Sequence, residues 1–232
     1  NTKVSSNTHT FSNSTLFGTW NTLYAGINNA NMFIENIDAS DLDEETRSRM
    51  KGEAKFLRAY YHWILVQGWH EVPLRKTSFK DVNKSSIEAT SHKEAINWII
   101  DEMEECVNMV DSTQYDNSPS YIKKNTVMGI LARVYLWKAG TACNGGVEDY
   151  KKAAYWANEV IQSGKHQLNP DYEDIWKKIA SDQYDITYNE SIWEAEFYGT
   201  RTDGNETMGR LGNVIGNVNK SQQYGYGYAA PT

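Results

Sequence analysis

The 232-residue chain lacks the features that mark several common protein classes. It contains no run of about 18 apolar residues, so the sequence predicts no transmembrane helix. Its two cysteines, Cys106 and Cys143, are too few for a disulfide scaffold and do not decide the redox compartment. The formal net charge of −7 offers no basic field to a polyanion, which argues against nucleic-acid binding.

Motifs for catalysis and for cofactors are also missing. The sequence has no G-x-S-x-G and no P-loop, and Gly225-Tyr226-Gly227 follows no strand-to-helix turn that would make it a phosphate cradle. His70-Glu71 lacks the second histidine of a zinc helix. The five histidines form no metal-ligand spacing: His9, His62, His70, His92 and His166. We therefore expect no metal and no cofactor.

The first residues carry no targeting signal. No signal peptide or lipid-attachment cysteine opens the chain, and Asn1 is not an initiator methionine. Residues 1–13 are mostly Ser, Thr and Asn, a composition that predicts a flexible lead-in. We expect the chain to be a piece of a longer protein.

The chain is organised around residues 52–69, which are closed by Glu71-Val72-Pro73-Leu74. Apolar and small residues recur there every three or four positions, and aromatic side chains widen this face around most of the helix. Asp41 followed by Glu44 can cap the start, and Pro73 cannot continue the helix. The sequence predicts a long central helix that neighbours cover on several sides. Its apolar positions are Met50, Ala54, Phe56, Leu57, Tyr60, Tyr61, Trp63, Ile64, Leu65 and Gly68.

The same periodicity predicts four further helices, over residues 14–38, 91–110, 125–140 and 147–163. Ser14 and Ser91 can cap the first two of these. We expect three acids of the second to point outward, namely Glu102, Glu104 and Glu105. In the last two helices the positions expected to point inward include Leu136, Ala153, Ala154, Ala157, Val160 and Ile161. The tryptophans expected in the core are Trp63, Trp98, Trp137 and Trp156.

Helices joined by short turns pack as antiparallel pairs, and small residues recur where these helices would cross. We therefore expect a mostly α fold of tetratricopeptide-like antiparallel helix pairs, an α–α superhelix, over residues 14–165. Residues 166–232 are predicted to be an irregular, loop-rich region with short strands. That region contains a short helix at 172–176 and a strand at 190–198, and it is expected to continue beyond the chain.

Three carboxylates of the predicted strand invite an enzyme hypothesis. Glu194 and Glu196 point the same way on a strand, and a pair of carboxylates can hydrolyse glycosides. The alternative is that these residues and Glu190 lie on the solvated side of an edge strand, as paired surface acids usually do.

The tyrosines at 224, 226 and 228 could form a ligand surface. Alternate glycines let the backbone approach a ligand closely, and flat rings could stack on the faces of sugars. The alternative is a strand whose tyrosines pack back on the helices. The same two interpretations apply to Trp69 at the exit of the central helix, and both stay open.

Six motifs in order resemble the SusD/RagB family. The stretch GEAKFLRAYYHWILVQGWHEVPL, residues 52–74, is similar to the family's G-E-A-x-F-L-R-A signature followed by V-P-L. The others are the opening at residues 20–31, L-A-R-V-Y-L at 131–136, the helix at 150–168, N-E-S-I-W at 189–193, and G-Y-G with P-T near the end. The resemblance covers residues 20–232, although family members run to roughly twice this length.

The resemblance implies a surface-exposed outer-membrane lipoprotein, held by a lipid anchor absent from this chain. Such proteins are not catalytic. They bind a nutrient, commonly an oligosaccharide or polysaccharide, and deliver it to a TonB-dependent, SusC-like transporter. Tetratricopeptide-like helices form the scaffold, and the ligand site lies in loops of the other half. Side-chain chemistry and position then favour these ligand-binding residues: Trp69, Tyr198, Arg201, Tyr224, Tyr226 and Tyr228.

Two hypotheses of other classes remain. A protein-interaction module, or a binder of peptide nutrients, would use the helical repeats and need no sugar site. An enzyme would use Glu194 and Glu196.

Overall fold

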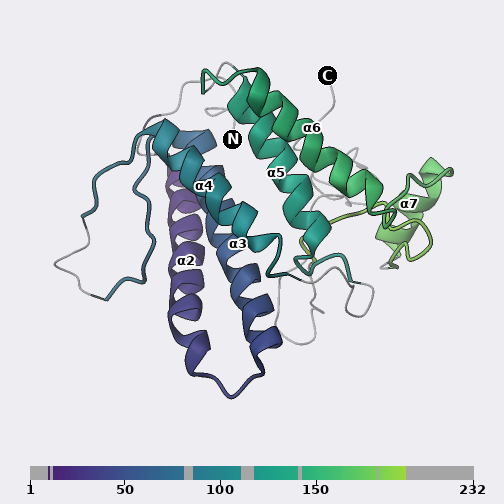
Figure 1. Ribbon diagram of the computed structural model, residues 1–232, viewed down its shortest axis with the longest axis horizontal. Coiled ribbons are helices and arrows are strands. Elements are labelled where there is room, and N and C mark those ends of the chain that lie inside the picture. Colours follow the sequence, from purple (N-terminus) through teal and green to yellow (C-terminus); the bar gives the residue numbers. More distant parts are fainter. Residues whose placement is uncertain are drawn as a thin grey trace, which may run out of the picture. The chain divides into compact units, whose positions relative to one another are not determined.

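The computed structural model describes residues 10, 13–80, 86–110, 118–140, 143–181 and 183–196 (Figure 1). They form α2 (Ser14–Asn36), the 3-10 turn η1 (Ile37–Ala39), α3 (Glu44–Trp69), α4 (His92–Cys106), α5 (Lys124–Ala139), α6 (Val147–Gln162) and α7 (Tyr172–Ala180). The described residues contain no strand, only an isolated bridge between Val72 and Thr90. The mostly α, tetratricopeptide-like fold that we expected is confirmed.

The chain divides into two compact units, residues 1–192 and 193–232. Every labelled helix lies in the first unit. Of the second unit the structure describes residues 193–196, which have no regular secondary structure.

Short polar side chains begin several helices, because they accept hydrogen bonds from N–H groups that have no partner within the helix. Asn13, one residue before the expected cap, accepts from the backbone of Thr15 and Leu16. Asp43, not Asp41, caps α3 by accepting from Thr46 at 2.8 Å. Ser91 caps α4, as the sequence predicts.

The central helix α3 packs against α2 on one side and α4 on another (Figure 1). Where the three helices meet, their buried side chains form a core. Its fully buried members include Ile27, Phe56, Ala59, Leu65, Val66, Ala95, Ile99 and Met103. At the crossing of α3 with the end of α4, Gly52 lies so close to Met109 that a Cβ there would meet the Met109 Cβ at 2.6 Å. Neighbouring elements therefore cover α3 on most of its surface, as its sequence indicates.

A network of charged groups is buried inside this three-helix layer. Arg58 of α3 pairs with Glu102 of α4 and donates to Asn31 Oδ1 of α2 at 2.8 Å. Lys55 lies 3.7 Å from the same Glu102 carboxylate and also pairs with Glu105. Asn31 in turn donates to the carbonyl of Arg75, so the network ties α2, α3, α4 and the segment after Pro73 together. The expectation that Glu102 points outward is wrong, because it neutralises two cations that α3 turns inward.

The second helix pair is far less enclosed. α5 and α6 pack on each other, and α4 contacts α5. In α6 only Ala153 of the expected inward set is buried, whereas Ile161 is 70% exposed and Ala154 and Ala157 are exposed. In α5, Leu136 is 55% exposed. Those expected burials are wrong, because α6 shares an extensive interface with α5 alone among the described elements.

The tryptophan predictions hold only in part. Trp63 is buried, with 3% exposure. Trp98, Trp137 and Trp156 are half-buried at the edges of the helical layer, so they are not full core members.

The strand predicted at 190–198 is wrong for residues 190–196, where the structure describes it. Asn189 has a left-handed φ of 49°, which breaks the extended course just before Glu190. The Glu190 carboxylate accepts the backbone N–H of Asn169 at 2.6 Å, and the carbonyl of Asn189 bonds His166 Nδ1 at 2.6 Å. These bonds tie the segment to a loop and not to a partner strand. The preceding helix α7 is longer than the 172–176 expected.

Candidate functional site

Trp69, the one proposed ligand residue that the structure describes, belongs to an aromatic cluster at the end of α3. Its ring meets the ring of Trp20 of α2 edge-on, with centroids 5.2 Å apart. Trp20 also packs on Tyr24, at 4.8 Å between centroids. Trp69 is half-buried, so it contributes to packing and keeps part of its ring in contact with solvent. Such a ring can cover one face of a sugar.

The backbone at the end of α3, next to this cluster, is fixed by several contacts. His70 ends α3 with a left-handed φ of 68°, and the bridge between Val72 and Thr90 holds the chain that follows. Tyr24 donates its hydroxyl to the carbonyl of Pro73 at 2.8 Å, and burial raises the pKa of Tyr24 well above its usual range. The phenol therefore stays neutral and keeps donating at any physiological pH.

The other five proposed ligand residues lie outside the residues that the structure describes. They are Tyr198, Arg201, Tyr224, Tyr226 and Tyr228. Their roles stay predictions.

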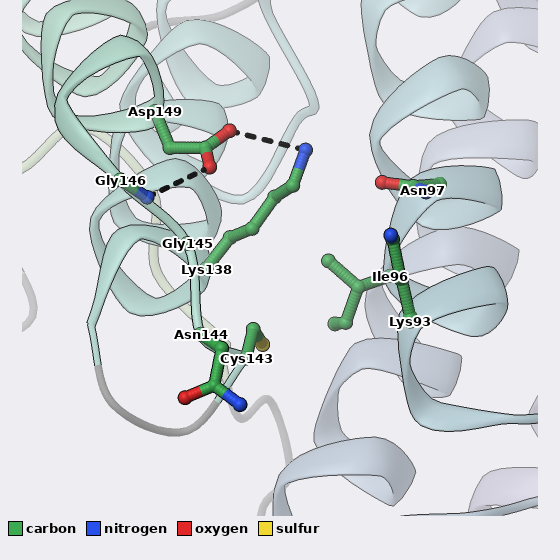
Figure 2. Close-up of a pocket in the computed structure, with 9 residues that line it drawn as sticks. All are labelled: Lys93, Ile96, Asn97, Lys138, Cys143, Asn144, Gly145, Gly146 and Asp149. Atoms are coloured by element: carbon green, nitrogen blue, oxygen red, sulfur yellow. Dashed lines mark hydrogen bonds and ion pairs between the residues drawn. The ribbon is translucent and has the colours of Figure 1, made fainter.

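A cavity of about 450 Å³ opens between α4 and the turn that joins α5 to α6 (Figure 2). Side chains of α4 form one wall, the end of α5 and the turn form the other, and Asp149 lines the cavity from the start of α6. The residues that line it are Lys93, Ile96, Asn97, Lys138, Cys143, Asn144, Gly145, Gly146 and Asp149. Its volume is in the range of small-molecule sites, about 300–1,000 Å³.

Charges inside this cavity are partly paired. Lys138 Nζ lies 3.1 Å from Asp149 Oδ1, and the backbone N–H of Gly146 donates to Asp149 Oδ2 at 3.4 Å. Burial raises the pKa of the Cys143 thiol, so it is protonated and is a poor nucleophile at neutral pH. The cavity thus offers polar recognition groups and no activated nucleophile.

Glu194 and Glu196, the pair behind the enzyme hypothesis, lie in residues 190–196, which form no strand, so the strand spacing that placed them on one face does not apply. Glu190 is used to hold the loop at Asn169, as described above. Across the residues that the structure describes, no three His, Cys, Asp or Glu side chains gather as a metal site would require. Nor does any helix in those residues have the length and apolarity to cross a membrane.

Two histidines meet at the exit of α3 without any signal in the sequence. The rings of His70 and His92 stack with centroids 3.9 Å apart and planes 11° apart. The ring of Trp137 meets His92 edge-on at 5.2 Å. Burial, and after it the neighbouring His70, lower the pKa of His92. The stack joins α3, α4 and α5 at one point, which is a structural role.

Comparison with known proteins gives consistent results. A family model described as "Starch-binding associating with outer membrane" (SusD-like) matches residues 1–136. SusD-like protein P25 of Formosa agariphila is 22% identical over 185 residues, which are 77% of this chain and 32% of that protein. SusD-like protein P2 of the same organism is 27% identical over 162 residues, or 68% of this chain and 30% of that protein. The chain thus spans about a third of the length of these curated relatives.

Solved structures share the fold. The crystal structure of a SusD homolog from Bacteroides thetaiotaomicron has a TM-score of 0.78 and 26% identity, covering 90% of this chain and 41% of that chain. A laminarin-binding SusD-like protein has a TM-score of 0.64 and 21% identity, covering 72% of this chain and 35% of its own. At that identity the second comparison shows the fold alone.

Proposed function

The chain belongs to the SusD-like family, described as starch-binding and associating with the outer membrane, and from this we propose that it is part of a non-catalytic glycan-binding protein. In this proposal the protein binds a nutrient oligosaccharide or polysaccharide at the cell surface. It then passes the glycan to a TonB-dependent, SusC-like transporter in the outer membrane, and a lipid anchor holds the protein at that membrane.

The observation that carries the proposal is the family match over residues 1–136. The fold supports it, because the same helical layer occurs in SusD-like proteins, one of which is named as binding laminarin. Composition agrees as well, since 15 Tyr and 8 Trp supply many rings that combine an apolar face with a polar edge.

We assign structural support and ligand binding to two different parts of the chain. Residues 14–165 are the scaffold and the face for protein partners, and residues 166–232 belong to the ligand-binding half. Trp69, at the exit of α3, is half-buried and lies on a backbone held by the bridge between Val72 and Thr90, so it can present a fixed ring to a glycan. Tyr198, Arg201, Tyr224, Tyr226 and Tyr228 are the proposed ligand residues of the second part.

Affinity electrophoresis against a panel of polysaccharides tests this function. The chain, and the longer protein it belongs to, are each run in gels with and without each glycan, and retardation by at least one glycan is expected. Retardation of the longer protein alone would mean that these residues are the scaffold only. If no glycan retards either protein, the proposal fails.

Trp69 can be tested in the same gels. Trp69→Ala should weaken retardation, because a stacked ring is lost from the site. Trp176→Ala is the matched control, since Trp176 of α7 is 55% exposed and has no proposed ligand role. Equal retardation of both variants and the unchanged chain would remove Trp69 from the site.

A protein-interaction function is the second candidate, and one surface favours it. Along α6, Val147, Tyr150, Ala154, Ala157 and Ile161 are all exposed and follow each other at intervals of three and four residues. This spacing makes a continuous apolar stripe that suits a partner helix. Binding to a helical peptide panel, with no glycan bound, would favour this candidate over the first.

A further inference from the structure

The cavity between α4 and the α5–α6 turn contains polar groups that the fold does not use. Within the described residues, the side chains of Lys93, Asn97 and Asn144 make no hydrogen bond or ion pair with another residue. The charge of Lys138 is balanced by Asp149 at 3.1 Å, so Lys93 leaves the cavity with one surplus positive charge. An ammonium and two amides around one cavity are recognition groups for a ligand that is both anionic and rich in hydroxyls.

The cavity is built by backbone constraints that place these groups. A Cβ at Gly145 would collide with the backbone at the end of α5, so only glycine lets the turn lie this close to Lys138 and Ala139. Asn144 has a left-handed φ of 49°, a conformation that asparagine tolerates better than most residues. On the opposite wall, Lys93 and Asn97 are four residues apart on α4 and therefore lie on one face of that helix. The two walls thus hold their polar groups on rigid supports.

The lining also has an apolar part. Ile96 extends from α4 toward the opposite wall, and the Cys143 side chain lies across from it (Figure 2). A sugar ring has polar hydroxyls at its rim and apolar C–H groups on its faces. Neutral amides and the Asp149 carboxylate can bond to the hydroxyls, while the half-buried Cys143 side chain, across from the buried Ile96, gives a C–H face an apolar neighbour.

We propose that this cavity binds a uronate, the carboxylate-bearing sugar unit of an acidic oligosaccharide, with Lys93 paired to its carboxylate. Asn97 and Asn144 bond to its hydroxyls. This assignment rests on the proposed glycan-binding function and makes it specific, since it selects acidic over neutral sugars. Trp69 is not among the residues that line this cavity.

Titration calorimetry of the intact chain tests the assignment with two probes, digalacturonate and its neutral counterpart galactobiose. We expect saturable binding of digalacturonate and at least tenfold weaker binding of galactobiose, because a charge-assisted hydrogen bond to Lys93 is lost. Lys93→Gln should weaken digalacturonate binding about tenfold, and Lys93→Arg should retain most of it. Lys152→Gln, which removes an exposed lysine of α6 outside the cavity, should leave the affinity unchanged.

Several outcomes would overturn the uronate site. These are equal affinity for both probes, no saturable binding of digalacturonate, or equal weakening by Lys93→Gln and Lys152→Gln. Displacement of digalacturonate by inorganic phosphate at equal concentration would also overturn it, because the cavity would then be a general anion site. A chain that neutral polysaccharides still retard in gels, but that fails these tests, would lose the uronate site and keep the proposed function.

Discussion

Helices α3 and α6 carry similar patterns of alanine and aromatic residues, yet the structure encloses one and leaves the other open. α3 lies between α2 and α4, and ten of its residues are buried, including Lys55, Arg58 and His62. α6 packs extensively on α5 alone among the described helices, and only Ala153 of its residues is buried. Position in the stack, and not apolarity, therefore decides how much of each helix is removed from water.

The difference also determines what each region can do. An enclosed helix must satisfy every polar group that it buries, and α3 does so with partners from α2, α4 and the segment after Pro73. An open helix retains an apolar face that can accept a partner. We infer that the α2–α3–α4 layer contributes most of the stability of the described residues, while α6 exposes an apolar face among them.

The largest effect should come from breaking the buried charge network. Arg58→Met leaves the Glu102 carboxylate, 13% exposed at its side chain, without its main counter-charge. We expect a loss of about 3–5 kcal/mol of unfolding free energy, the usual cost of removing one partner of a buried ion pair. Urea unfolding followed by circular dichroism measures it.

The matched control is the exposed pair between Lys177 and Glu173 on α7. Lys177→Gln should cost about 0.5 kcal/mol or less, since surface pairs contribute little. If Arg58→Met costs no more than Lys177→Gln, the network does not stabilise the layer.

Acid should weaken the layer through His62. Burial lowers the pKa of His62 from 6.5 to about 4, and the ring accepts the N–H of Arg75 through Nε2 at 3.2 Å. Below pH 6.5 the unfolded chain binds a proton that the folded chain refuses until about pH 4, so stability falls as pH falls through this window. The loss attributable to His62 is roughly 3 kcal/mol, at about 1.4 kcal/mol per pKa unit.

His62→Gln removes this titration and should flatten the dependence of stability on pH between 6.5 and 4. Carboxylates affect stability at lower pH than His62 does. Hydrogen bonds from Lys80 and Ser78 lower the pKa of Glu35 to about 2, so the stability that its ionised form contributes is lost only as the pH falls below about 4.5. An unchanged slope in His62→Gln would show that this histidine does not titrate as described.

Replacing two helix glycines with alanine should change the free energy of unfolding in opposite directions. Gly52→Ala places a Cβ 2.6 Å from the Met109 Cβ and should cost about 1–3 kcal/mol, as overpacking does. Gly129→Ala in α5 meets nothing within 4 Å, so it should stabilise by up to about 1 kcal/mol through higher helix propensity. Thermal and urea unfolding of both variants give the signs, and equal signs would contradict the close crossing at Gly52.

The smallest effect is expected on the open face of α6. Ile161→Gln removes an apolar side chain that is 70% exposed, so the change in unfolding free energy should stay within about 0.5 kcal/mol. A loss of 2 kcal/mol or more, the range of about 2–5 kcal/mol for truncating a core side chain, would mean that another part of the protein covers this face.

The spacing of apolar residues and the residues that begin or end helices predicted most of the helical layer. The helices begin and end within a few residues of the expected positions, because apolar spacing, short polar caps and Pro73 act locally along the chain. The antiparallel pairing of α2 with α3 followed from the short turn between them.

Properties that depend on distant neighbours could not be predicted. Glu102 was expected in solvent, since only the fold shows that Arg58 and Lys55 face it. Ile161 has an inward pattern but no second neighbour to cover it. The strand at 190–198 needed a partner strand, which the pattern of one segment does not reveal.

The candidate site was predicted less well than the fold. Trp69 lies at the helix exit, as the sequence predicts, and its ligand role stays a prediction, whereas the cavity near Lys93 gave no sequence signal. Its walls come from α4 and from a turn about 50 residues later, and a lysine and two asparagines on a polar surface are common. The tyrosine prediction lies outside the described residues and stays a prediction.

The most direct test of the central claim, that a helical scaffold supports a glycan site carried by the following loops, compares variants from the two parts. Calorimetry with the glycan that gives the strongest retardation is run on Tyr224→Ala/Tyr226→Ala/Tyr228→Ala and on the scaffold variant Ile161→Gln. The account predicts that the triple variant loses at least tenfold in affinity while Ile161→Gln binds as the unchanged chain does. Unchanged affinity in the triple variant, or an equal loss in both, would contradict it.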